Sequence, residues 1–285
     1  MQALPVWCNL AERPRRTATL CAVLATGLGL AYLVLAGAPG RYVSINIGAM
    51  LLGLVLLGAG CLAERVTRRW SGPLILAGGV LLLLTSQFGA SLDGAQRWIV
   101  IHGLVVQPSL LLLPVMAVGF AGRRDTLSTT GMIVAALALA LQPDRAMAGA
   151  LVVSLIVLAL VCRAKTVMIA LAAAVTGFTA SLLQADQLPV QPFVEQVFLT
   201  AFAAHPLAGP AVILGAGLMI LPALTGSPRT RPTMAVFGAV WLAILAATVL
   251  GHYPTPVVGY GGSGVIGYLI SLIGLPKSGG AEAAK

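Results

Sequence analysis

Residues 85–114 read TSQFGASLDGAQRWIVIHGLVVQPSLLLLP, in which a polar segment separates two strongly apolar runs. The polar part includes DGAQRW at residues 93–98, and the second apolar run begins after QPS at residues 107–109. A short polar connection between apolar runs of this kind is typical of a loop at the membrane surface. The stretch therefore predicts a chain that crosses a membrane repeatedly, with unusual polar residues at the ends of its helices.

The composition of the whole chain supports a membrane environment. The 285 residues are 59% hydrophobic and only 9% charged, which is more apolar surface than a soluble domain can bury. The chain divides into apolar runs close to the roughly 20 residues that cross a bilayer core. The predicted fold is an all-α polytopic membrane protein with about ten transmembrane helices, at residues 17–38, 42–63, 71–88, 104–121, 128–142, 146–162, 166–183, 197–223, 232–250 and 263–276.

The basic residues predict the membrane topology of the chain. With the N-terminus inside, fourteen Lys and Arg residues fall on inner segments, and only Arg41, Arg97 and Arg145 fall on outer ones. This positive-inside bias predicts that the N-terminus and the C-terminus are both cytoplasmic. The net charge of +9 follows from the same asymmetry and from anionic lipid at the inner surface. We therefore expect no nucleic-acid partner.

The chain is predicted to form one membrane domain and no soluble domain. The first apolar run is too long for a secretion signal, so we expect a retained first span. The cysteines at positions 8, 21, 61 and 162 match no zinc-site spacing, and we expect free thiols. The predicted parts are a cytoplasmic leader (1–16), a ten-span membrane domain (17–276) with outer segments at 89–103 and 184–196, and a cytoplasmic tail (277–285).

Three stretches of the chain resemble one known family. DGAQRWIVIHGLVVQPS at residues 93–109 resembles the Gly-Ala-Arg-Arg-Trp … Gln-Pro-Ser signature of the SEDS family, the FtsW, RodA and SpoVE proteins of cell division and elongation. ALQPDRAMAGAL at residues 140–151 resembles the Gln-Pro-Asp segment of that family. PTPVVGYGGSGVIGYLISLIG at residues 254–274 resembles its Pro-x-Pro … Tyr-Gly-Gly-Ser segment. All three occur in the order that the family has.

The resemblance implies a function in the cell wall. The family polymerises lipid-linked disaccharide-peptide into glycan strands in the bacterial cytoplasmic (inner) membrane, usually beside a single-span transpeptidase. It thus implies a polyprenyl-linked lipid as ligand and the transmembrane helix of a transpeptidase-like protein as partner. Guanidinium groups suit pyrophosphate oxygens, and tryptophan suits the membrane interface. The candidate substrate-binding residues are Arg97, Trp98, Gln107, Ser109, Gln142, Asp144, Arg145, Tyr260 and Ser263.

The chain departs from the family pattern where ionisable residues are expected inside a span. In the family, Gln-Pro-Ser is typically followed by Glu and, three residues later, by Lys. Here Leu110 and Leu113 occupy those positions. An ionisable pair inside a membrane is costly and is normally kept for function. Its replacement by leucine removes both the cost and the chemistry.

A second departure concerns the outer loop that holds the essential Asp of the family. The corresponding link here is short, QADQLPVQPFVEQ at residues 184–196, and Asp186 in it is only a weak catalytic candidate. The following stretch resembles the family's Asp-Phe-Ile-Phe … Glu-Glu-Leu-Gly run. Glu195 stands where the Asp would be, and alanines replace the acidic pair. His205, beside them, is expected to be a structural hydrogen-bonding residue.

These departures leave three hypotheses on function. The first is a catalytically degenerate SEDS-like protein that acts as a scaffold or accessory subunit of a membrane complex. The second is a divergent peptidoglycan glycosyltransferase that uses Asp186 or Asp144 as its base. The third is a transporter of lipid or of a small substrate, disfavoured because ionisable groups near the membrane midplane are scarce. No metal or other cofactor is expected, because the three histidines lie in separate segments without paired spacing.

Overall fold

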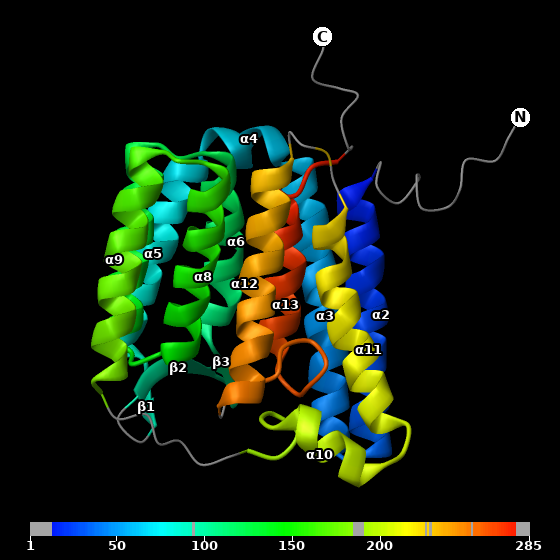
Figure 1. Cartoon of the computed structure of the whole chain (residues 1–285). Helices are drawn as coiled ribbons and strands as arrows, with labels where there is room; N and C mark the ends of the chain where they lie inside the picture. The colour runs from blue at the N-terminus through cyan, green and yellow to red at the C-terminus, as the bar shows by residue number, and fades with distance from the viewer. Residues whose placement is uncertain are drawn as a thin grey trace, which may run out of the picture.

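The computed structural model describes residues 13–92, 95–184, 191–225, 227, 230–251 and 253–277. Its long helices run side by side in one bundle (Figure 1). The short helix α4 lies at one end of the bundle, and a small sheet with the short helix α10 lies at the other. We call these the α4 end and the sheet end. The helices are α2 (Pro14–Leu35), α3 (Gly40–Leu62), α4 (Glu64–Arg69), α5 (Ser71–Phe88), α6 (Pro108–Gly122), α7 (Thr126–Leu141), α8 (Arg145–Val161), α9 (Lys165–Leu182), α10 (Val197–Ala204), α11 (Ala208–Ile220), α12 (Arg231–Leu250) and α13 (Gly262–Ser271), with 3₁₀ turns η1 (Leu221–Leu224) and η2 (Leu272–Gly274).

The helices account for the apolar runs of the sequence and confirm the prediction of a polytopic helical membrane protein. In the described part of the chain, α2, α3, α5, α9 and α12 are long and apolar enough to cross a membrane. Shorter apolar helical segments occupy the remaining predicted spans, at Pro108–Gly122, Thr126–Leu141, Arg145–Val161, Ala208–Leu224 and Gly262–Gly274. Many leucines, isoleucines and valines on the outer faces of the bundle are exposed, which suits contact with lipid rather than water.

The predicted span at residues 104–121 begins four residues too early. Residues 104–106 form strand β3 (Leu104–Val106), which pairs antiparallel with β2 (Ala95–Ile101), and β2 pairs with β1 (Ala90–Leu92). His102 and Gly103 connect β2 to β3 with φ angles of 49° and 79°, the positive values that a tight hairpin turn requires. The helix begins at Pro108, because proline at the first helical position lacks only an N–H that would be unpaired there.

The predicted span at residues 197–223 is broken at His205. Its φ and ψ of −160° and 143° are extended, as expected for a residue before a proline. Its Nδ1 accepts a hydrogen bond of 3.1 Å from the backbone N–H of Leu207. The structural role expected for His205 is therefore confirmed, and the single span becomes α10 followed by α11.

The centre of the bundle is close-packed, and its polar groups are paired. The rings of Trp241 and Tyr268 lie 5.0 Å apart between centroids. The Tyr268 hydroxyl donates to the Met219 carbonyl at 2.8 Å, and Trp241 Nε1 donates to Ser271 Oγ at 3.2 Å. Each of these donors is buried, so each hydrogen bond removes a desolvation cost of about 1–3 kcal/mol.

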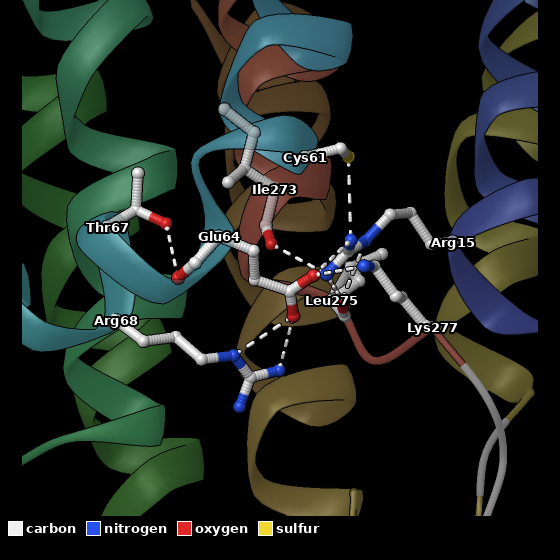
Figure 2. A network of polar contacts seen from close by, with 8 residues as sticks. All are labelled: Arg15, Cys61, Glu64, Thr67, Arg68, Ile273, Leu275 and Lys277. Carbon is white, nitrogen blue, oxygen red and sulfur yellow. Dashed lines mark hydrogen bonds and ion pairs between the residues drawn. The ribbon is translucent and has the colours of Figure 1, made fainter.

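The α4 end is held together by charged groups from three separated parts of the chain. Figure 2 shows Arg15 of α2 and Lys277, which follows η2, directed at Glu64 of α4. Glu64 Oε2 lies 3.3 Å from Arg15 Nη1 and 2.8 Å from Lys277 Nζ, while Arg68 Nη2 lies 2.8 Å from Oε1. Partial burial raises the pKa of Glu64, but its contacts with Lys277, Arg15 and Arg68 outweigh burial and lower it to about 2.

Candidate functional site

Residues from three helix starts meet at the sheet end in what we call the Asp144 cluster, which comprises Gln107, Ser109, Asp144 and Ser263. Asp144 is fully buried. Its Oδ1 caps α8 by accepting from the backbone N–H of Met147 at 3.2 Å. Its Oδ2 accepts from Gln107 Nε2 at 3.0 Å and from Ser109 Oγ at 2.9 Å. The backbone N–H of Gln107 donates to Ser263 Oγ at 3.0 Å. The three motifs of the sequence therefore come together in space.

Arg97 holds the hairpin against the connection between α7 and α8. Its guanidinium is buried and donates to the carbonyl of Gln142 at 3.2 Å and to that of Pro143 at 2.6 Å. The Gln142 side chain in turn donates to the Leu82 carbonyl at 2.7 Å. Arg97 Cζ also lies 5.8 Å from the ring centroid of Trp98. These contacts give Arg97 a positioning role.

Arg145 closes the end of α9. Its guanidinium donates to the carbonyls of Ser181 at 3.3 Å and Leu182 at 3.4 Å, and also to the carbonyl of Gln184. Basic side chains often pair with the last carbonyls of a helix in this way, since those carbonyls have no partner within the helix. Arg145 thereby joins the start of α8 to the end of α9.

A cavity of about 600 Å³ lies beside the Asp144 cluster. Four of the predicted site residues, Trp98, Gln107, Tyr260 and Ser263, are part of its lining. Arg97, Ser109, Gln142, Asp144 and Arg145 are not among the lining residues. Asp186 lies outside the described residues. Most of the wall is apolar, and its members come from α3, β3, α6, residues 191–195 and residues 254–266: Ile45, Ala49, Leu52, Leu104, Val105, Val106, Leu110, Leu111, Val194, Pro254, Pro256 and Ile266.

Glu195 also lines this cavity and was not predicted as a site residue. It is only 6% exposed. The segment before it is pinned by two backbone hydrogen bonds of 2.7 Å, from Thr255 N–H to the Val194 carbonyl and from Tyr260 N–H to the Phe193 carbonyl. The available signal in the sequence was the correspondence of Glu195 to the Asp of the family motif.

An aromatic stack forms one side of the cavity. The rings of Tyr42 and Tyr260 lie 3.7 Å apart between centroids and within 9° of parallel. Phe193 packs edge-on against Tyr42, and Arg41 Cζ lies 5.3 Å from the centre of the Tyr42 ring. Burial and the neighbouring Tyr42 raise the pKa of the Tyr260 hydroxyl, while Arg41 acts to lower it. Sequence reasoning missed Arg41 and Tyr42, whose only signal is a cation beside an aromatic at the start of a span.

Leu110 and Leu113, which stand where the SEDS pattern has an ionisable pair, occupy different places. Leu110 lines the cavity and is 5% exposed, whereas Leu113 is fully buried one turn further along α6. Replacement at position 110 therefore makes the cavity wall apolar. At position 113 a charge would stand in the packed core, where burial of an unpaired ion is costly.

No protein-family model and no curated protein matches the chain by sequence. Solved structures do match by fold. The rod-shape-determining protein RodA of Thermus thermophilus aligns with a TM-score of 0.61 and 19% identity, over 90% of this chain and 93% of that one. A point mutant of the same RodA aligns with a TM-score of 0.60 and 18% identity, over 90% of this chain and 94% of that one. A chain of a peptidoglycan synthase complex aligns with a TM-score of 0.60 and 20% identity, over 90% of this chain and 94% of that one. The chain therefore has a RodA-like, SEDS-type fold.

Proposed function

We propose that this protein is a catalytically degenerate SEDS-type membrane protein that binds a lipid-linked cell-wall precursor in the cavity at the sheet end. It acts as a scaffold or accessory subunit of a complex in the bacterial inner membrane. Both chain ends are cytoplasmic, which places the sheet end on the outer side. The RodA-like fold and the likeness to a chain of a peptidoglycan synthase complex support this assignment.

The observation that carries the proposal is the chemistry of the cavity wall. A volume of about 600 Å³ lies within the range of sites that hold small ligands, and such sites are mostly apolar with few polar groups. The wall here is apolar even at Leu110, where the family carries an acid. A hydrocarbon chain suits such a surface, because it makes dispersion contacts with apolar side chains and leaves no polar group of its own without a partner.

The residues around the cavity also support the proposal that polymerase activity has been lost. Glycosyl transfer needs a base near the acceptor and cations near the leaving pyrophosphate. Among the described residues, Glu195 is the only carboxylate that lines the cavity, and Leu110 stands where the family carries an acid. Arg97 and Arg145 are engaged with backbone carbonyls. In this arrangement they hold the fold together.

The test is an assay with purified protein in mild detergent and fluorescent lipid II. Polymer is read on a gel, and retained lipid is read by native mass spectrometry. We expect lipid II to be retained and no polymer to form, with or without a co-purified partner. Leu110→Glu places a charge in the wall and should reduce retention, whereas Leu62→Glu, at the exposed end of α3 next to α4, should not. Polymer formation by the parent chain would contradict the proposed degeneracy.

The position of Glu195 favours a second candidate function, a divergent peptidoglycan glycosyltransferase. A carboxylate that lines a cavity can act as a general base when it lies within hydrogen-bond reach of the proton it abstracts. In this case the parent chain forms polymer and Glu195→Gln abolishes it. Asp125→Asn, which alters a carboxylate at the opposite end of the bundle, serves as the control and should leave turnover unchanged.

The proposed partner is the transmembrane helix of a transpeptidase-like protein. Crosslinking in native cells, followed by purification, should recover one membrane protein in constant ratio to this chain. Purification of this chain alone after crosslinking would contradict the accessory-subunit role. Cysteine labelling in intact cells tests the membrane topology. A cysteine placed at Val105 should react with an impermeant reagent, and one placed at Arg68 should not.

A further inference from the structure

The start of α13 exposes unpaired backbone donors to the cavity. Gly261 at the N-cap position offers no side-chain acceptor. In the described part of the chain, the backbone N–H groups of Gly262, Ser263 and Gly264 have no hydrogen-bond acceptor, and all three residues line the cavity. The N-terminus of a helix of this length carries a partial positive charge, and its free N–H groups suit an anion.

A separate observation at the same place also indicates a ligand. Thr255 lines the cavity and is 1% exposed, yet its Oγ1 has no hydrogen-bond partner among the described residues. A buried hydroxyl without a partner costs about 1–3 kcal/mol, and such groups are rare in folded proteins. Pro256 and Val257, the two residues after Thr255, pack against Gly264 at the start of α13. Thr255 and Gly264 line the same cavity, so the Thr255 hydroxyl is a further donor for an anion there.

A positively charged side chain, Arg41, lies next to the cavity wall and would attract an anion. Arg41 lies against Tyr42, which stacks on Tyr260, two residues before α13 begins. Arg41 forms no hydrogen bond or ion pair with any residue of the described ranges. Of the three cations predicted to face outward, Arg97 and Arg145 are engaged with backbone carbonyls. Arg41 is thus the cation available to a ligand there.

The geometry points to an anion site for the phosphate-bearing headgroup of a lipid, formed by the N-terminus of α13, the Thr255 hydroxyl and the Arg41 guanidinium. This inference rests on the proposed function and deepens it. It assigns the headgroup to the α13 side of the cavity, at Arg41, instead of to Arg97 and Arg145. The apolar wall around Leu110 and Ile266 then takes the hydrocarbon chain.

The experiment compares four probes on the purified protein by native mass spectrometry: undecaprenyl pyrophosphate, undecaprenol, phosphatidylglycerol and inorganic pyrophosphate. The wild-type chain should retain undecaprenyl pyrophosphate at least tenfold better than undecaprenol, a size typical of charge-assisted hydrogen bonds. Arg41→Gln should lower retention of the pyrophosphate lipid about tenfold, and Thr255→Val about threefold. Neither variant should change retention of undecaprenol. The control Arg69→Gln, at the α4 end, should change neither.

The outcomes separate the anion site from the proposed function. Equal retention of undecaprenyl pyrophosphate and undecaprenol, or no effect of Arg41→Gln, overturns the anion site but leaves the lipid cavity intact. Loss of binding of every lipid by the folded wild-type chain overturns both. Retention of phosphatidylglycerol equal to that of the pyrophosphate lipid supports the anion site and identifies an ordinary membrane phospholipid as its source. Displacement by inorganic pyrophosphate alone supports a site that recognises the phosphate groups themselves.

Discussion

Replacing Asp144 tests whether the cluster at the sheet end holds the helix starts together. Asp144→Ala removes the acceptor for the α8 cap and for both Gln107 Nε2 and Ser109 Oγ. Loss of an N-cap costs about 1 kcal/mol, and each hydrogen bond to a charged acceptor contributes about 1.5–3 kcal/mol. Gln107 and Ser109 keep a mutual hydrogen bond of 3.1 Å, which offsets part of the loss. We therefore expect destabilisation of about 4 kcal/mol.

Asp125→Ala is the matched control. Asp125 caps α7 by accepting from the backbone N–H of Ser128 at 2.8 Å, but its ion pair with Arg123 is exposed. The expected loss is about 1 kcal/mol for the cap and less than about 1 kcal/mol for the pair. Thermal unfolding in one detergent should lower Tm by about 8 °C for Asp144→Ala and about 3 °C for Asp125→Ala, from roughly 2 °C per kcal/mol.

Asp144→Asn separates the two parts of the effect. The amide has one acceptor oxygen, so it can serve either the α8 cap or the Gln107 and Ser109 donors, but not both. Its Tm should fall between those of wild type and Asp144→Ala. Equal Tm shifts for the two alanine variants, or no shift for Asp144→Ala, would refute the role given to the cluster.

Two further perturbations test the packing and the charges of the bundle. A Cβ at Gly267 would lie 2.0 Å from the Leu110 carbonyl oxygen, whereas one at Gly217 meets nothing within 4 Å. Gly267→Ala should therefore destabilise the protein by about 1–3 kcal/mol, and Gly217→Ala should stabilise it by about 0.5 kcal/mol. Both effects are measured as shifts in Tm. The depressed pKa of Glu64, about 2 against an ordinary 4.5, contributes at most about 3 kcal/mol, present above pH 4.5 and lost as the pH falls toward 2. Stability measured over this range should decline in wild type and decline less in Glu64→Gln; parallel curves would contradict the assigned ion pairs.

The helices could be predicted because each apolar run approaches the length that crosses a bilayer. The hairpin could not, because Ile99–Ile101 and Leu104–Val106 are as apolar as a span. Only the positive φ angles of His102 and Gly103, which hydropathy does not reveal, separate the two strands. The break at His205 was better signalled, since Pro206 disfavours a helical residue before it.

The candidate site was predicted in part. Its three motifs do converge, as the hydrogen bonds of Gln107 with Asp144 and Ser263 show. Residue type alone could not reveal that the Arg97 guanidinium donates hydrogen bonds to backbone carbonyls. The cavity itself depends on contacts between distant parts of the chain, such as the 2.9 Å hydrogen bond from Asn46 Nδ2 to the Gly259 carbonyl. Such long-range pairing leaves no local pattern in the sequence, so Tyr42 and Thr255 were missed.

Site-specific photocrosslinking to radiolabelled lipid II tests most directly whether the cavity receives the lipid chain. A photoreactive amino acid is placed at Leu111 in the cavity wall or at Leu242 on the exposed face of α12. We expect strong crosslinking at position 111 that excess undecaprenyl pyrophosphate abolishes, and weak crosslinking at position 242 that the competitor does not affect. Equal crosslinking at the two positions, insensitive to the competitor, would contradict this expectation.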